Sequence, residues 1–154
     1  LIEYIQGEDI SMSGQAYDPN NIFGKILRGE IPCHRVYEDA DTLAFMDVMP
    51  QSPGHLLVIP KVPSRNILDA DPAVLSKLIP VVQKLAKAAK EAFEADGVTI
   101  VQFNEPASGQ TVYHLHFHVI PRYEGLALKP HSGQMEDNNA LAAHAEKLIG
   151  VLGD

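Results

Sequence analysis

The sequence has little of four things, and each shortage narrows the range of functions. Cys33 is the only cysteine, so no disulfide can form within the chain, and a reducing cytoplasmic location is expected. No apolar run approaches the ~20 residues of a membrane helix, and no signal peptide is visible. Basic residues number 12 against 20 acidic ones, and the formal net charge of −8 disfavours nucleic acid as a partner. A single nucleotide is not disfavoured, because its phosphates need only a few local donors.

The length of 154 residues fits one domain with a sizeable core. Residues 13–20 are small, polar and turn-prone, so residues 1–19 are expected to form a flexible N-terminal arm. Met12 resembles a native start, and residues 1–11 are therefore expected to be of non-native origin. Residues 20–154 are the expected single domain.

Apolar periodicity, caps and turn residues predict an order of helices and strands for this domain. In chain order we expect a short helix over 21–28, strands over 34–38, 42–47 and 55–60, a long helix over 71–96, strands over 98–104 and 113–121, and a C-terminal helix over 137–152. Pro80 is expected to kink or split the long helix. Short connections favour antiparallel pairing, so the predicted class is α+β, with an antiparallel sheet of about five strands.

Three histidines alternate with apolar residues in the stretch His114-Leu115-His116-Phe117-His118-Val119. In an extended strand, alternate side chains point to opposite faces. The three imidazoles are therefore expected on one face, with the apolar side chains toward the core. Successive histidines would lie about 6.5 Å apart, close enough to serve one ligand.

Such a row of imidazoles suits three kinds of site. A metal site is one, although a single flat strand rarely wraps three ligands around a tetrahedral ion. An acid–base site is the second, and nucleophilic catalysis by one imidazole is the third. The alternative to these sites is a solvent-exposed strand face that happens to carry histidines and has no function. Three further histidines lie outside any motif and are expected at the surface, namely His34, His131 and His144.

The stretch from His114 to Pro121 resembles the motif of the histidine triad (HIT) family of nucleotide hydrolases and transferases. The resemblance extends over about residues 20–125 with its spacing intact. The other matching segments are Ile22-Phe23-Gly24-Lys25-Ile26, Gly29-Glu30-Ile31-Pro32, Ala44-Phe45-Met46-Asp47-Val48, Gly54-His55-Leu56-Leu57-Val58-Ile59-Pro60-Lys61, Asn104, and Gly109-Gln110-Thr111-Val112.

The resemblance implies catalytic roles for four histidines. His116 would be the nucleophile and form a covalent nucleotidyl-histidine, which water then hydrolyses. The main-chain carbonyl of His114 would fix the tautomer of His116. His118 would donate to a phosphate oxygen or to the scissile bridge, and His55 would form a hydrogen-bonded relay with His114.

The resemblance also implies a nucleotide-binding set and a homodimer, with no cofactor. Asp47 would hold the ribose hydroxyls, because a carboxylate only accepts hydrogen bonds, and its alternative is a solvated charge at a strand end. The remaining members of the expected set are Val48, Asn104, Gly109, Gln110 and Thr111. The loop residues among them would contact phosphate, or would serve only to form the turn.

Two departures from the family pattern bear on the chemistry. The segment that carries Cys-x-x-Cys in zinc-binding members is Asn21-Ile22-Phe23-Gly24 here, so we expect no structural zinc and no other metal. Pro121-Arg122 resembles the diadenosine-polyphosphate branch, whereas Asn104 resembles the phosphoramidase branch. Because these two features resemble different branches, the sequence does not identify the leaving group of the substrate.

The expected function is therefore hydrolysis at the α-phosphate of purine nucleoside phosphoramidates or dinucleoside polyphosphates. Two alternatives stand beside it. One is a nucleotide-binding regulatory protein whose hydrolysis is incidental. The other is a metallohydrolase that uses the three alternating histidines as ligands.

Overall fold

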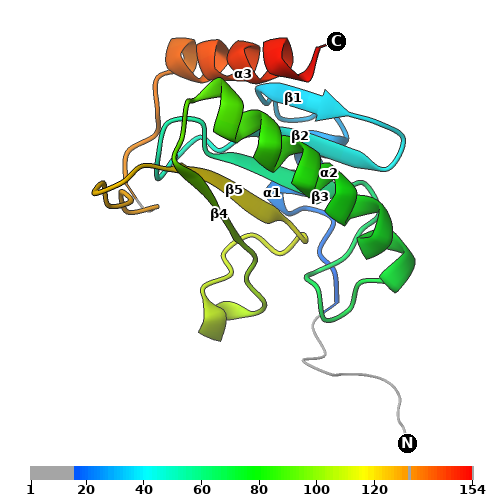
Figure 1. Cartoon of the computed structure of the whole chain (residues 1–154). Helices are drawn as coiled ribbons and strands as arrows, with labels where there is room; N and C mark the ends of the chain where they lie inside the picture. The colour runs from blue at the N-terminus through cyan, green and yellow to red at the C-terminus, as the bar shows by residue number, and fades with distance from the viewer. Residues whose placement is uncertain (1–15, 132, 154) are drawn as a thin grey trace, which may run out of the picture.

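The computed structural model describes residues 16–131 and 133–153. Five strands, three α-helices and one short 3-10 helix follow one another along this part of the chain (Figure 1). In order they are α1 (Ile22–Leu27), β1 (Arg35–Glu38), β2 (Thr42–Met46), β3 (Leu56–Pro60), α2 (Pro72–Ala92), β4 (Gly97–Val101), η1 (Pro106–Ser108), β5 (Phe117–Arg122) and α3 (Asn138–Leu152).

The strands form one sheet in the order β1-β2-β3-β5-β4, and every neighbouring pair is antiparallel. The last strand of the sequence, β5, is therefore an inner strand, placed between β3 and β4. The α+β class and the five-stranded antiparallel sheet predicted from the sequence are confirmed. Because β5 pairs with a strand along each of its edges, its residues 117–121 are all buried.

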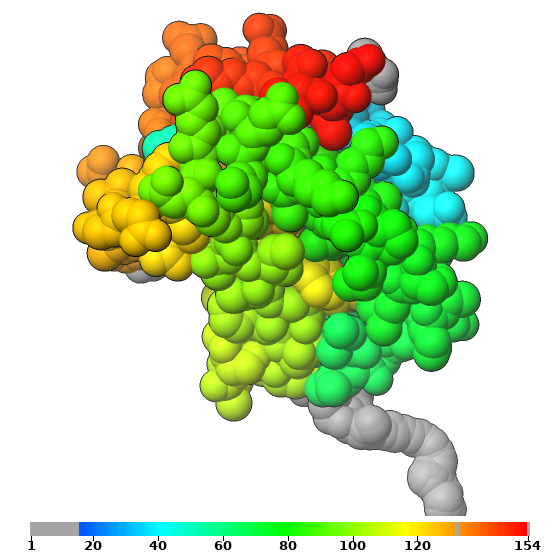
Figure 2. All heavy atoms as spheres, in the orientation of Figure 1, coloured from blue at the N-terminus to red at the C-terminus, as the bar shows by residue number. Residues whose placement is uncertain are grey.

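The two faces of the sheet are covered unequally. Helices α2 and α3 pack on one face and hide most of the sheet from that side (Figures 1 and 2). The larger apolar core lies between these helices and the strands, and includes Leu85, Leu115 and Phe117. A smaller cluster on the opposite face gathers around Phe23 of α1 and includes Leu57. The histidine motif lies on this second, less covered face.

Local sequence signals account for the helices. The Asn21 side chain accepts a hydrogen bond from the backbone N–H of Gly24 and so caps α1. Asp71 caps α2, and Pro72 occupies its first turn, where the missing N–H costs nothing. Helix α2 continues through Pro80 without a break, so the predicted split is wrong. Within the described residues, no helix is long and apolar enough to cross a bilayer.

Three predicted boundaries differ from the structure by three or four residues. Helix α2 ends at Ala92 rather than at residue 96. Strand β4 ends at Val101 rather than at residue 104. Strand β5 begins at Phe117 rather than at residue 113, because the backbone N–H of Leu115 donates to the carbonyl of Ser64 instead of joining the ladder.

The described end of the predicted N-terminal arm is anchored to the domain. The Tyr17 hydroxyl hydrogen-bonds Nδ1 of His114 at 2.6 Å, and the carbonyl of Pro19 accepts from Arg28. The sequence prediction did not include these contacts. The proposed non-native origin of residues 1–11 lies outside the described residues.

Candidate active site

Two of the three alternating histidines face each other on the α1 side of the sheet. His118 lies within β5, opposite Leu57 of β3 and Val101 of β4. His116 immediately precedes the strand, and its ring meets that of Phe23 edge-on at 4.9 Å. The ring centroids of His116 and His118 are 5.1 Å apart. These two imidazoles are therefore close enough to act on one group.

The first histidine of the motif is not part of this row. His114 lies before β5, in a bend, and is completely buried. Its Nε2 hydrogen-bonds the carbonyl of Pro60 at 2.8 Å, and its Nδ1 hydrogen-bonds the Tyr17 hydroxyl at 2.6 Å. The expectation that three rings share one strand face is therefore wrong for His114, because both of its ring nitrogens are committed to the protein. The metallohydrolase alternative fails for the same reason.

The tautomer of His116 follows from one contact. Its Nδ1 lies 2.6 Å from the main-chain oxygen of His114. A carbonyl only accepts, so Nδ1 carries the proton and Nε2 keeps its lone pair. This is the contact expected from the family resemblance, and it leaves the Nε2 lone pair without a partner among the described residues.

A second chain of contacts fixes the tautomers of His55 and His118. The backbone N–H of Gln51 donates to Nδ1 of His55 at 3.0 Å, so the His55 proton is on Nε2. That Nε2 lies 2.9 Å from Nδ1 of His118, which must therefore accept and leave the His118 proton on Nε2. The expected relay from His55 to His114 is wrong, because His55 bonds to His118 instead. The result is a lone pair on His116 and an N–H on His118.

Asp47 and His131 extend this chain away from the motif. Asp47 follows β2 and is 4% exposed. Its Oδ1 accepts from the backbone N–H of Met49, and its Oδ2 lies 2.6 Å from Nε2 of His131. The same Oδ2 is 3.3 Å from Nε2 of His55. Oδ1 accepts from one donor among the described residues, and a carboxylate oxygen has two lone pairs, so Oδ1 can also accept a ribose hydroxyl while Oδ2 stays on His131.

His131 was predicted to lie at the surface, and that prediction is wrong. The side chain is 35% exposed and its ring centroid lies 5.6 Å from those of both His55 and His118. No sequence motif marks it, and nothing in the spacing of residues 122–136 points to the site. Lys129, which exchanges hydrogen bonds with Gln51, and Glu136, which donates to the carbonyl of Val48, hold this segment beside the site.

Burial keeps the motif histidines uncharged. It lowers the pKa of His55 and of His114 to about 4 and that of His118 to about 3. The pKa of His116 is lowered as well, again by burial. The four imidazoles are therefore neutral at pH 7, as a nucleophile must be.

The Asp47–His131 pair carries the opposite charges. The hydrogen bond to Asp47 raises the pKa of His131 above its usual range. Burial works to raise the pKa of Asp47, but the hydrogen bond from His131 and the nearby His55 hold it below its usual value. This pair favours the charged form of His131 next to a group of neutral histidines.

One residue of the expected phosphate loop, Gln110, has a structural side chain. Gln110 is buried and makes four side-chain hydrogen bonds, as donor to the carbonyls of Arg65 and Val112 and as acceptor from Asn66 and Glu105. No amide valence is left for a phosphate, so the expected side-chain role is wrong.

Asn104 is half-buried and is committed only in part. An amide nitrogen has two hydrogens, and the contacts of Asn104 among the described residues use one of them, so the other can donate to a phosphate. Its Oδ1 accepts from the backbone N–H of Ile67 and from Gln102, and its Nδ2 donates back to Gln102. The side chain therefore orders its own loop and the neighbouring segment.

Three other expected residues remain open to a ligand. Thr111 is exposed and Val48 is 39% exposed. Gly109 has φ +107°, a conformation that favours glycine. Its Cβ position lies 3.6 Å from the ring of Phe103, which in turn meets the ring of His118 at 5.7 Å. The loop thus reaches the edge of the histidine site.

Two other histidines lie away from the site. His34 is partly exposed and hydrogen-bonds Asn138 at 3.3 Å. His144 packs edge-on against Phe93, and burial lowers its pKa. Its Nδ1 is buried and has no hydrogen-bond partner in the described part of the chain, so His144 is less superficial than predicted.

Comparison with known proteins gives the family of this chain. The HIT domain model matches residues 28–125. The chain belongs to the HIT family. Among solved structures, a Hit-like protein of Bartonella henselae is 58% identical, with a TM-score of 0.84 and coverage of 88% of this chain and 99% of the other. A zinc-bound HIT-family protein of Mycobacterium smegmatis is 34% identical, with a TM-score of 0.77 and coverage of 86% and 93%.

Two relatives in the HIT family have names that state an activity. An adenosine 5'-monophosphoramidase of Candida albicans is 38% identical over 105 residues, which is 66% of this chain and 69% of the relative. An adenylylsulfatase of Arabidopsis thaliana is 37% identical over 103 residues, which is 67% of this chain and 52% of the relative. Both names describe hydrolysis at an adenylyl group.

The zinc of the mycobacterial relative raises the question of whether this chain can hold a metal. One ligand atom from each of Asp47, His55, His118 and His131 lies within 4.8 Å of the others. Zinc binding through Nε2 of His55 would place the ring proton on Nδ1, which faces the N–H of Gln51. Metal-bound histidines instead direct the second nitrogen at an acceptor.

The spacing of the cluster also disfavours zinc. Oδ2 of Asp47 and Nε2 of His131 lie 2.6 Å apart, closer than the roughly 3.3 Å between ligands of a tetrahedral zinc ion. This is hydrogen-bonding distance. The cluster does not fit zinc, and we derive no step through a metal.

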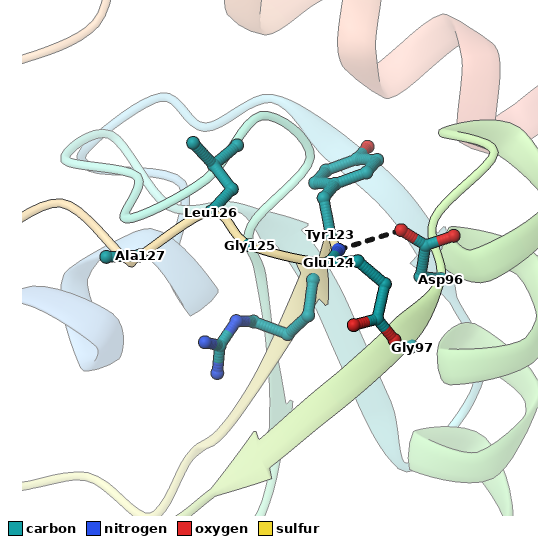
Figure 3. A pocket seen from close by; sticks show the side chains of 8 residues that line it. Asp96, Gly97, Tyr123, Glu124, Gly125, Leu126 and Ala127 are labelled. Atoms are coloured by element: carbon teal, nitrogen blue, oxygen red, sulfur yellow. Dashed lines mark hydrogen bonds between the residues drawn. The ribbon is translucent and has the colours of Figure 1, made fainter.

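A separate open hollow of about 530 Å³ contains none of these histidines. Its lining runs from Asp96 and Gly97 to the segment 122–127 (Figure 3). The backbone N–H of Glu124 donates to Asp96 there. This hydrogen bond ties the segment after β5 to the residue that precedes β4.

Proposed function

We propose that this protein hydrolyses adenylyl compounds at the α-phosphate, with His116 as the nucleophile and a nucleotidyl-histidine as intermediate. The observation that carries the proposal is the pair of fixed tautomers. Nε2 of His116 has a lone pair because Nδ1 donates to the His114 carbonyl, while His118 has its N–H on Nε2. A nucleophile and a donor thus lie on neighbouring rings.

The family supports an adenylyl group as the part that is transferred. Both named relatives act on adenosine 5'-phosphate derivatives, one with nitrogen and one with sulfate as the leaving group. We extend this to phosphoramidates and dinucleoside polyphosphates of purine nucleosides. The exposed Val48, Gly109 and Thr111 are the proposed nucleotide contacts. Oδ1 of Asp47 is the proposed acceptor for a ribose hydroxyl, while Oδ2 stays on His131.

We further propose a homodimer formed through strand β4. This strand is at the edge of the sheet and pairs only with β5 among the described strands. Its Ile100 side chain is 46% exposed, and an unpaired strand edge is a template for a second strand. The molar mass in solution, measured by light scattering, tests the proposed dimer, and a monomer at micromolar concentration would exclude it.

We also propose a cytoplasmic location, because the chain has a single cysteine and so can form no internal disulfide.

The function is tested with a panel of substrates that share the nucleotide and differ in the leaving group. The panel contains adenosine 5'-phosphoramidate, adenylyl sulfate, diadenosine polyphosphates and their guanylyl counterparts. We expect saturable release of the nucleoside monophosphate, unchanged by exhaustive chelation. Tight binding without release from any member would instead identify a nucleotide-binding regulator, and loss of turnover on chelation would identify a metallohydrolase.

A further inference from the structure

We propose that His131 supplies the proton that the leaving group takes up. The inference rests on the proposed function, because it concerns how the leaving group is protonated when His116 displaces it from the α-phosphorus. His131 touches no reacting atom. It acts through Asp47 and His55 on His118, and is therefore a positioning and proton-supplying residue.

An unbroken line of short contacts joins His131 to the ring that faces the substrate. Nε2 of His131 lies 2.6 Å from Oδ2 of Asp47. That oxygen lies 3.3 Å from Nε2 of His55, which lies 2.9 Å from Nδ1 of His118. The rings of His55, His118 and His131 pack together with centroids 5.1–5.6 Å apart. Protons can pass along such a line without large movements.

The motif histidines cannot supply the proton themselves. Each holds one ring proton, and its other ring nitrogen is an acceptor or a lone pair. If His118 gave its Nε2 proton without replacement, an imidazolate would form beside the buried Asp47 carboxylate. His131 is the imidazole whose charged form the neighbouring carboxylate stabilises.

The step balances when the four groups act together. Nε2 of His116 bonds the α-phosphorus as the bond from phosphorus to the leaving nitrogen breaks. The leaving nitrogen keeps the electron pair and takes the Nε2 proton of His118. Nδ1 of His118 takes the proton of His55, and Nε2 of His55 takes the proton of His131 through Oδ2 of Asp47. His131 ends neutral, and Asp47, His55 and His118 end in the charge states in which they began.

The surroundings of His131 allow it to be charged and recharged. The ionisable groups that face it are the Asp47 carboxylate and the neutral rings of His55, His118 and His116. The carboxylate dominates, so the pKa of His131 is raised. The side chain is 35% exposed, so water can return the proton after each turnover. The proton source is present below this pKa and is lost as the pH rises through it.

The test compares two leaving groups on the same adenylyl group in wild type and His131→Asn. A p-nitrophenyl ester leaves as a stable anion and needs no proton, whereas an alkylamine needs one. For the variant we expect kcat to fall about 10²-fold with the amine substrate and less than about 3-fold with the p-nitrophenyl ester. The fall of wild-type kcat at high pH with the amine should be absent from the variant.

His34→Asn is the matched control, because His34 is partly exposed and lies outside the site. It should leave both substrates unaffected. Equal losses on both substrates in His131→Asn would show a structural role for His131, and no loss on either would show none. Either result overturns the inference. Absence of turnover by the wild type on both substrates overturns the proposed function instead.

A measurement without substrate gives a second readout. In ¹⁵N spectra of histidine-labelled protein at pH 6.5, His131 should show both ring nitrogens protonated. His55 and His118 should each show one proton, on Nε2. A neutral His131 under these conditions would overturn the inference even if the variant lost activity.

Discussion

The two faces of the sheet are built on different principles. The face under α2 and α3 holds the larger apolar cluster, whose members come mostly from helices and strands in regular register. The opposite face holds a smaller apolar cluster around Phe23 and a row of buried polar groups. Stability thus resides mainly on the first face, and the reactive groups lie on the second.

The polar face also draws on more distant parts of the chain. Tyr17 contacts His114 across 97 residues, and His131 contacts Asp47 across 84. Hydrogen-bond partners fix the tautomers of the motif histidines and leave Nε2 of His116 and Nε2 of His118 without a partner among the described residues. The difference teaches that the site is specified by hydrogen-bond direction, whereas the core is specified by packing.

The largest predicted difference between the faces concerns His116. His116→Ala should lower turnover by at least about 10³-fold, because it removes the nucleophile. The free energy of unfolding should fall by about 1 to 3 kcal/mol, because the buried ring donates to the His114 carbonyl, so turnover is measured where circular dichroism shows the variant folded. The comparison breaks if the variant turns over substrate at an appreciable rate, or if it loses activity only because it unfolds.

A truncation on the apolar face should show the reverse pattern. Leu85 belongs to α2 and is completely buried, and Leu85→Ala should lower the free energy of unfolding by about 3 kcal/mol. The kcat of the folded variant should stay within about 3-fold of wild type. Leu126, which is 60% exposed, gives the control Leu126→Ala, with little expected change in stability. A loss of kcat without a loss of stability in Leu85→Ala would show that the two faces are not independent.

More of the apolar face than of the polar face can be predicted from the sequence. Helical spacing, caps and alternation are local, so the strands, α2 and the burial of Leu115 and Phe117 follow from the sequence. The motif also gives His116 and the His114 carbonyl. Neither His131 nor Tyr17 has a local signal, because only the fold brings them to the site.

Some errors in the predicted site have the same physical origin. An alternating pattern places side chains correctly only where the strand continues. The chain leaves the strand before Phe117, so His114 turns into the protein. Gln110 carries an amide that suits a phosphate, but a buried amide must be satisfied first, and the protein supplies its partners.

Acid should destabilise the polar face before the apolar one. The folded-state pKa of His55 and of His114 is about 4, whereas an unfolded histidine has about 6.5. The unfolded state therefore binds more protons below pH 6.5, and stability falls as the pH drops toward 4. The loss is about 2 kcal/mol for each of the two at pH 5. Urea unfolding between pH 7 and 5 measures it, and a constant free energy of unfolding would contradict buried neutral histidines.

The smallest predicted effect sharpens the role of the N-terminal contact. Tyr17→Phe keeps the ring and removes the hydroxyl that donates to Nδ1 of His114. We expect a loss of about 1 kcal/mol in stability and a fall in kcat of only a few-fold, since the Pro60 bond still holds the His114 ring. A fall as large as that of His116→Ala would mean that Tyr17 acts on the substrate directly.

The central claim is tested most directly by trapping the intermediate. Protein mixed with a radiolabelled adenylyl substrate is quenched within one turnover and digested, and the labelled peptide is sequenced by mass spectrometry. We expect one adenylyl group on His116, attached through Nε2, and none in His116→Ala. A label on another residue, or product formation in a burst without labelled protein, would contradict the account.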